Sequence, residues 1–116
     1  MIFVGEGKYK VWLKDEKLDR GIVITVGGGK FSHIGSIVLT EPRNSRTGKG
    51  FSCTSQIINI HGHKEENVAR MFAEKICLMK NVPVLCVCGI HIDCATKKDI
   101  KILVSNAKKL LKKYMS

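Results

Sequence analysis

The stretch "VPVLCVCGI" (residues 82–90) is a nearly unbroken apolar run. A run of this length and composition is typical of a strand that is covered on both faces. In the preceding segment, residues 65–79, the apolar side chains recur at helical spacing. A strand expected over 51–60 comes before that helix. Strand, helix and buried strand form a crossover unit, so strands 51–60 and 83–92 should run parallel with a right-handed connection.

Three more strands are expected before the crossover unit. The first is "YKVWLK" (9–14), followed by the charged turn "DEKLDRG". The next two, "GIVITVGGGK" (21–30) and "HIGSIVLTEP" (33–42), are β-branched runs and should be consecutive antiparallel strands. The segment "RNSRTGKG" (43–50) has turn-forming residues and three basic residues, Arg43, Arg46 and Lys49, and is typical of an exposed loop.

A second helix is expected at the carboxyl end. Thr96 and Asp99 have the spacing of a capping box, and the apolar residues after them recur at helical spacing as far as Leu111. The element order is then β-β-β-β-α-β-α. We therefore expect an α+β or α/β fold in which two helices pack against a single mixed β-sheet, and one domain that spans residues 1–116.

Composition and charge narrow the class of protein. The chain has 116 residues, 44% of them hydrophobic and only two of them proline, which indicates a packed globular domain. Its net charge of +10 attracts phosphates and acidic partners. Aromatic residues are few, so nucleic-acid binding is not favoured. The sequence shows no apolar run long enough to cross a membrane and no secretory signal, so we expect a soluble, cytoplasmic protein.

The five cysteines are expected to be reduced. Their number is odd, and four of them lie in apolar runs, which argues against a secreted disulfide framework. Cys86 and Cys88 are separated by one residue, whereas a zinc knuckle usually has two between its cysteines. We expect both side chains to pack in the core.

Polar residues gather where the two parallel strands are expected to end. The segments "HGHKE" (61–65) and "GIHIDCAT" (89–96) each follow a strand and lead into a helix. Because the carboxyl ends of parallel strands share one edge of a sheet, the two segments should meet there, as ligand sites in open sheets do. Two helix amino termini would then offer free N–H groups to a phosphate or carboxylate. His63, Lys64, His91 and Thr96 add donors.

A metal site is the alternative at this edge. His61, His63, His91, Asp93 and Cys94 include the ligand types that zinc or iron prefers. The H-x-H spacing is common, however, and the nearby basic residues disfavour a cation. These observations favour an anion site over a metal site.

The glycine-rich segment "VGGGKFSHIGS" (26–36) lacks the spacing of a nucleotide P-loop and does not open a helix. A hairpin between two strands is the simpler interpretation. Such a hairpin could still bring Lys30 and His33 to a ligand. No Ser-His-acid triad is recognisable by spacing, so the sequence offers no support for catalysis.

Four fragments taken together resemble a known family. They are "GGGKFSHIG" (27–35), "EPRNS" (41–45), "GHKEE" (62–66) and "GIHIDCAT" (89–96), and they occur in the family's order. The chain resembles the prenylated-flavin chaperone family, also called the gallate decarboxylase D-subunit family, from about residue 20 to its end. The resemblance implies a fold similar to that of small proteasome-assembly chaperones, which work as dimers.

The resemblance also implies site residues. The matching positions include seven candidates for binding flavin mononucleotide (FMN) or its prenylated form: His33, Arg43, Ser45, His63, Lys64, His91 and Asp93. Arg43 would pair with the phosphate, helped by Lys64 and the helix start at His63. His91 and Asp93 would orient each other and contact the flavin ring. His61 departs from the family's pattern, which weakens a two-histidine metal site.

Three functions remain in competition. The resemblance implies a non-catalytic accessory subunit or chaperone, dimeric in the manner of the family, that binds prenylated FMN or FMN or delivers it to a decarboxylase. A metal-dependent enzyme using His63, His91 and Asp93 is the second. The third is an interaction module of the assembly-chaperone type, whose basic surface binds an acidic partner and no small ligand.

Overall fold

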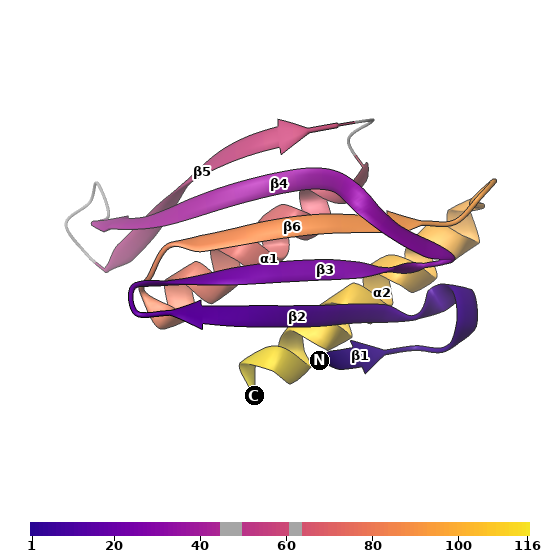
Figure 1. The fold of residues 1–116 in the computed structure, drawn as a ribbon, viewed down its shortest axis with the longest axis horizontal. Coiled ribbons are helices and arrows are strands. Elements are labelled where there is room, and N and C mark those ends of the chain that lie inside the picture. Colours follow the sequence, from indigo (N-terminus) through magenta and orange to yellow (C-terminus); the bar gives the residue numbers. More distant parts are fainter. Residues whose placement is uncertain (45–49, 61–63) are drawn as a thin grey trace.

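A computed structural model describes residues 1–44, 50–60 and 64–116 (Figure 1). These residues form six strands, two α-helices and one short 3-10 helix, η1. In chain order the elements are β1 (Ile2–Val4), η1 (Gly7–Tyr9), β2 (Val11–Leu18), β3 (Gly21–Gly29), β4 (Phe31–Asn44), β5 (Phe51–Asn59), α1 (Lys64–Lys80), β6 (Val84–His91) and α2 (Lys97–Met115).

The strands form one mixed sheet in the order β1-β2-β3-β6-β4-β5. Only the β3–β6 pair is parallel among the described strands; every other neighbouring pair is antiparallel. The single mixed sheet with two helices is therefore confirmed. Strands β5 and β6 run in the same direction, as the crossover unit predicts, but β4 lies between them.

The expected hairpin between residues 21–30 and 33–42 is wrong in its pairing. Strands β3 and β4 do run in opposite directions, but β6 is inserted between them and pairs with both. The apolar run of β6 has aliphatic or cysteine side chains on both faces, and a central strand suits that composition better than an edge strand does. The turn from β3 to β4 passes the end of β6, where the Lys30 N–H donates to the His91 carbonyl oxygen over 2.7 Å.

The number of strands and two strand limits also differ from expectation. An additional strand, β1, pairs with β2 at the sheet edge. The segment expected to turn at "DEKL" instead continues β2 to Leu18, because its backbone pairs with β3 and the Asp15 carboxylate accepts a hydrogen bond from the Tyr114 hydroxyl of α2 over 2.7 Å. Strand β4 passes through Pro42 to Asn44 and pairs with β5 over this end.

Both helices lie on one side of the sheet, behind it in Figure 1. Helix α1 covers β4, β5 and β6, and α2 covers β1 and β2. Their amphipathic stripes place Phe72, Ile76 and Leu110 in the core with no exposed surface. The strands contribute alternate residues to this core, including Leu13, Ile24, Val26, Val38, Val84 and Cys86. Both predicted helices are confirmed.

The other side of the sheet, which we call the open face, is not covered by either described helix. Leu85 and Val87 of β6 point to it and are only half-buried. The expectation that this strand is covered on both faces is therefore wrong for the single chain. Both helices follow strands that end at the same edge, and each connection returns along the same side of the sheet.

The cysteines of β6 behave as expected. Cys86 and Cys88 point into the core and are fully buried, and the five thiols are free. Burial raises the pKa of Cys86 to about 12 and that of Cys77 to about 11, so these thiols are poor nucleophiles and metal ligands. Neither described helix is long and apolar enough to span a membrane.

Candidate functional site

Five polar or aromatic residues meet where β3 and β6 end and β4 begins. We call Phe31, His33, Glu65, His91 and Asp93 the His33–His91 cluster. The register places Phe31 of β4 opposite His91 of β6, with Gly29 of β3 on the other side of His91. Figure 1 shows the beginning of β4 bending across the end of β6. The cluster thus lies at the edge where the sequence predicts a ligand site.

The aromatic part of the cluster is a stacked pair. The Phe31 and His91 rings are 4.5 Å apart between centroids, with 27° between their planes. The His33 ring meets the edge of His91 at 5.8 Å and 87°. Phe31 is 51% exposed. A half-exposed aromatic pair offers a flat apolar surface to a planar ligand.

Each histidine of the cluster has a carboxylate partner. The His91 Nε2 atom is 2.8 Å from Asp93 Oδ1, on the exposed side of the cluster. The His33 Nε2 atom is 3.3 Å from Glu65 Oε1, and the Glu65 side chain is largely buried. Glu65 lies in the first turn of α1, where the helix dipole favours a negative charge. These contacts fix the orientation of both rings.

Two glycines make room for the beginning of β4. Gly27 and Gly89 are register partners on the open face. A Cβ atom on Gly89 would lie 1.6 Å from the His33 carbonyl oxygen, and one on Gly27 would lie 2.2 Å from the Trp12 ring and 2.9 Å from Ser32 Cβ. The chain around His33 therefore crosses directly over these two residues. Pairing between β4 and β6 is irregular between Ser32 and Ser36, where this crossing ends.

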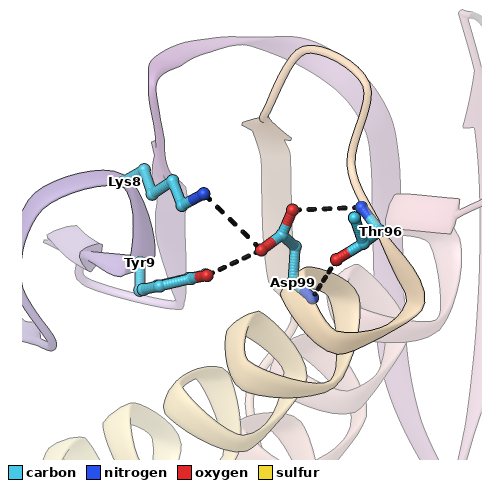
Figure 2. Close-up of polar contacts among 4 residues, drawn as sticks. All are labelled: Lys8, Tyr9, Thr96 and Asp99. Carbon is cyan, nitrogen blue, oxygen red and sulfur yellow. Dashed lines mark hydrogen bonds and ion pairs between the residues drawn. The ribbon is translucent and has the colours of Figure 1, made fainter.

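A second polar group fixes the start of α2 (Figure 2). Thr96 and Asp99 form the predicted capping box: Thr96 Oγ1 accepts from the Asp99 N–H and Asp99 Oδ2 accepts from the Thr96 N–H, both over 3.0 Å. The Tyr9 hydroxyl donates to Asp99 Oδ1 over 2.6 Å, and Lys8 Nζ lies 3.7 Å from the same oxygen. Thr96, expected to be a donor to a ligand, is thus engaged in the cap.

The hydrogen bonds of this group shift two pKa values. The Tyr9 hydroxyl and the Thr96 backbone stabilise the Asp99 carboxylate and lower its pKa to about 2. The same bond to Asp99 raises the pKa of Tyr9, with help from burial. Asp99 therefore stays ionised at neutral pH and joins the amino-terminal segment to α2. Its role is structural.

Arg43 does not lie with the cluster. It is near the other end of β4, ten positions from His33, which is roughly 30 Å along a strand. There Arg43 Nε donates to Thr54 Oγ1 over 2.9 Å. Lys64 is the first residue of α1 and so lies at the same edge as the cluster. Ser45 and His63 lie outside the described residues.

The structure therefore brings together His33, His91 and Asp93 of the seven predicted site residues. Sequence reasoning missed Phe31 and Glu65. Both could have been included among the candidates, because Phe31 lies in the fragment "GGGKFSHIG" and Glu65 lies in "GHKEE". Within residues 1–44, 50–60 and 64–116 no three His, Cys, Asp or Glu residues are grouped so that they could hold a metal ion. His61 and His63, two of the candidate metal ligands, lie outside that part of the chain.

A separate groove of about 510 Å³ lies between α1 and the carboxyl end of α2. Its lining combines apolar side chains such as Met71 and Leu111 with the lysines Lys75, Lys108 and Lys112. Lys108 and Lys112 lie near the carboxyl end of α2, where Lys109 and Lys113 add two more basic residues. The groove opens on the helical side of the molecule, whereas Phe31 and His91 lie at the sheet edge.

A comparison with known protein families identifies the family of the chain. A family model described as a prenylated flavin chaperone LpdD-like domain matches residues 5–116. The chain belongs to this family. The match spans nearly the whole chain, and it includes both the crossing of β4 over Gly27 and Gly89 and the His33–His91 cluster. The comparison with curated proteins gave no match.

The family's cofactor can be tested against the residues of the cluster. A flavin ring needs flat apolar cover and a few hydrogen bonds. Phe31 and His91 supply the flat surface, and His33 supplies a ring N–H or acceptor. The cluster therefore fits the flavin ring. The phosphate of FMN needs N–H groups and a cation, and the described cluster holds no arginine.

Proposed function

We propose that this protein binds prenylated FMN, or FMN itself, at the His33–His91 cluster and delivers it to a decarboxylase. The stacked pair of Phe31 and His91, beside the His33–Glu65 contact, carries this proposal. The pair is half-exposed and lies at a sheet edge, so a flavin ring bound there is accessible to a partner protein. Family membership supports the chaperone role.

Each residue of the cluster has a part in this proposal. Phe31 and His91 cover one face of the flavin ring, and Asp93 holds the His91 ring in its orientation. His33, oriented by Glu65, forms a hydrogen bond with a polar atom of the ring. Lys64 and the first N–H groups of α1 face the phosphate. Arg43 also pairs with the phosphate in this proposal, and because it lies at the far end of β4, it does so from a second copy of the chain.

The decarboxylation chemistry belongs to the cofactor and to the partner enzyme. Prenylated FMN would supply the decarboxylation chemistry in the enzyme, while this chain binds and orients the cofactor. We therefore assign the protein as a non-catalytic accessory subunit. We further propose that it works in the cytoplasm as a homodimer, in line with the resemblance of its family to small assembly chaperones.

An anaerobic titration with FMN and with reduced prenylated FMN tests the proposal. Saturable binding is expected, and Phe31→Ala should weaken it roughly tenfold, because it removes the stacked ring and its apolar area. Phe3→Ala is the matched control. Phe3 is 47% exposed on β1, three positions away from β6 in the strand order, and its loss should leave flavin affinity unchanged. Absence of binding of either flavin by the unaltered protein would refute the proposal.

The lysine-lined groove favours a second candidate, an interaction module for an acidic partner. Three lysines around an apolar floor suit an acidic amphipathic segment. In this case no flavin would bind, and affinity for the partner would fall steeply as salt is added. Lys108→Glu would then abolish the interaction, while Phe31→Ala would not affect it.

A further inference from the structure

The open face carries a continuous set of half-buried aliphatic side chains. Val23, Ile37, Leu39, Leu85 and Val87 alternate with residues that point into the core, and none of them packs against the core cluster. The molecule measures 45 × 27 Å across this face (Figure 1). A rectangle of these two dimensions has a larger area than the roughly 800 Å² that each partner buries in a standard protein interface. The apolar run of β6 is typical of a strand that is covered on both faces, which indicates that another protein surface packs on this side.

The register arranges the open face in two neighbouring rows across the sheet. One row consists of Lys14, Thr25, Val87, Ile37 and Ile58. The next consists of Glu16, Val23, Leu85, Leu39 and Gln56. Both rows are aliphatic in the middle, and on β2 they end in opposite charges. Lys14 and Glu16 are exposed.

These charges select one symmetric arrangement of two copies. A two-fold axis that runs between the rows, across the strands, lays each row on the other row of the second copy. Lys14 of one copy then meets Glu16 of the other, twice, around an aliphatic centre. An axis along the strands would instead set Lys14 and Glu16 against uncharged residues, which are Ile37 and Leu39 on β4 or Ile58 and Gln56 on β5. The aliphatic centre supplies affinity, and the charge pairs fix the orientation.

The same axis joins the separated parts of the flavin site. It crosses β4 at Val38, between Ile37 and Leu39, and His33 and Arg43 are each five positions from Val38 along the strand. Rotation about the axis exchanges the two ends of β4. Arg43 of one copy is therefore carried to the His33–His91 cluster of the other, where a phosphate needs a cation.

We infer that a second copy of this chain docks on the open face in this orientation, and that Arg43 of each copy completes the flavin site of the other. The role of Arg43 toward the flavin rests on the function proposed above. The docking does not, because it follows from the rows of the open face. The two parts are therefore tested separately.

The docking is tested by charge reversal and sedimentation equilibrium, without flavin. Lys14→Glu places like charges at both symmetric contacts and should raise the dimer dissociation constant about tenfold. The double variant Lys14→Glu/Glu16→Lys should restore it. Lys75→Glu, on the helical side, is the control with the same change of net charge and should have little effect. A monomer at all concentrations, or a dimer that Lys14→Glu leaves unchanged, would overturn the docking.

The contribution of Arg43 is tested by mixing two variants. Arg43→Ala and His33→Ala should each bind FMN weakly. If Arg43 acts on the other copy, an equal mixture re-forms an intact site in each mixed dimer, and about a quarter of the sites should recover. If both residues act within one chain, none should recover. No binding by the unaltered protein would refute the proposed function instead.

Cross-linking gives a readout that needs no flavin. A chain carrying His33→Cys and Arg43→Cys, with the exposed Cys94 replaced by serine, should be joined into covalent dimers by a short bismaleimide. The two positions are too far apart along β4 for the reagent to join them within one chain. A dimer that does not cross-link would overturn the placement of Arg43.

Discussion

At the scale of single residues, the site depends on close approach of backbone to backbone. The chain around His33 can cross β6 only because Gly89 and Gly27 lack side chains. This crossing places Phe31 against His91 and lets His33 reach Glu65. The glycines therefore contribute to the site because their lack of side chains leaves room for the beginning of β4.

Replacement of Gly89 by alanine should destabilise the fold and disturb the site together. The added Cβ would lie 1.6 Å from the His33 carbonyl oxygen, so the beginning of β4 must move. Overpacking of this kind costs about 1–3 kcal/mol or more in free energy of unfolding. Gly21→Ala is the control, because its Cβ would meet only the Pro83 carbonyl oxygen at 3.3 Å. Urea unfolding measures both variants, and equal losses would contradict this account.

At the scale of elements, the start of α2 is tied to the amino-terminal segment. The spacing of Thr96 and Asp99 in the sequence predicted the capping box. The hydrogen bond from Tyr9 to Asp99 could not be predicted in this way, because the two residues are 90 positions apart. The Asn106 side chain strengthens the same connection by donating to the Tyr9 carbonyl oxygen over 2.8 Å. These contacts hold η1 against α2.

The stability of this connection should depend on pH. The pKa of Asp99 is about 2 in the folded protein, below its ordinary value of 3.8, so the carboxylate stabilises the fold above pH 3.8. This contribution is lost as the pH falls from about 4 toward 2. The Asp99→Asn variant lacks this stabilising contribution of the carboxylate at every pH, in contrast to the unaltered protein. The difference in unfolding free energy between the two proteins should therefore shrink over this range in urea titrations, and a constant difference would contradict the assignment.

At the scale of the whole molecule, the two sides of the sheet have different roles. Side chains that point toward α1 and α2 form the core, while those on the open face are half-buried in the single chain. Adjacent residues of one strand can thus contribute to different properties. Strand β6 gives a direct comparison, because Leu85 and Cys86 are neighbours on opposite sides.

Serine at each of these two positions should separate folding from association. Cys86→Ser places a hydroxyl in the core and should lower the free energy of unfolding by about 1–3 kcal/mol. Leu85→Ser should change the unfolding of the dilute monomer much less, but should weaken the dimer. Chemical unfolding at low concentration and sedimentation measure the two effects. The reverse pattern would show that the open face is part of the folding core.

Local patterns in the sequence determined much of this protein. They set the crossover from β5 through α1 to β6, the cap of α2 and the burial of Cys86, because each depends on periodicity or on residues a few positions apart. They also placed His91 and Asp93 at the end of a strand. Similar fragments indicated the family, which the match over residues 5–116 confirms.

Only the tertiary structure decided which strands are neighbours and which site residues meet. Insertion of β6 between β3 and β4 depends on pairing between distant segments, and local propensity carries no information about it. The same pairing brought Phe31 and Glu65 to the histidines and left Arg43 at the far end of β4. It also left one side of β6 uncovered by the two described helices, since both connections return along the same face of the sheet.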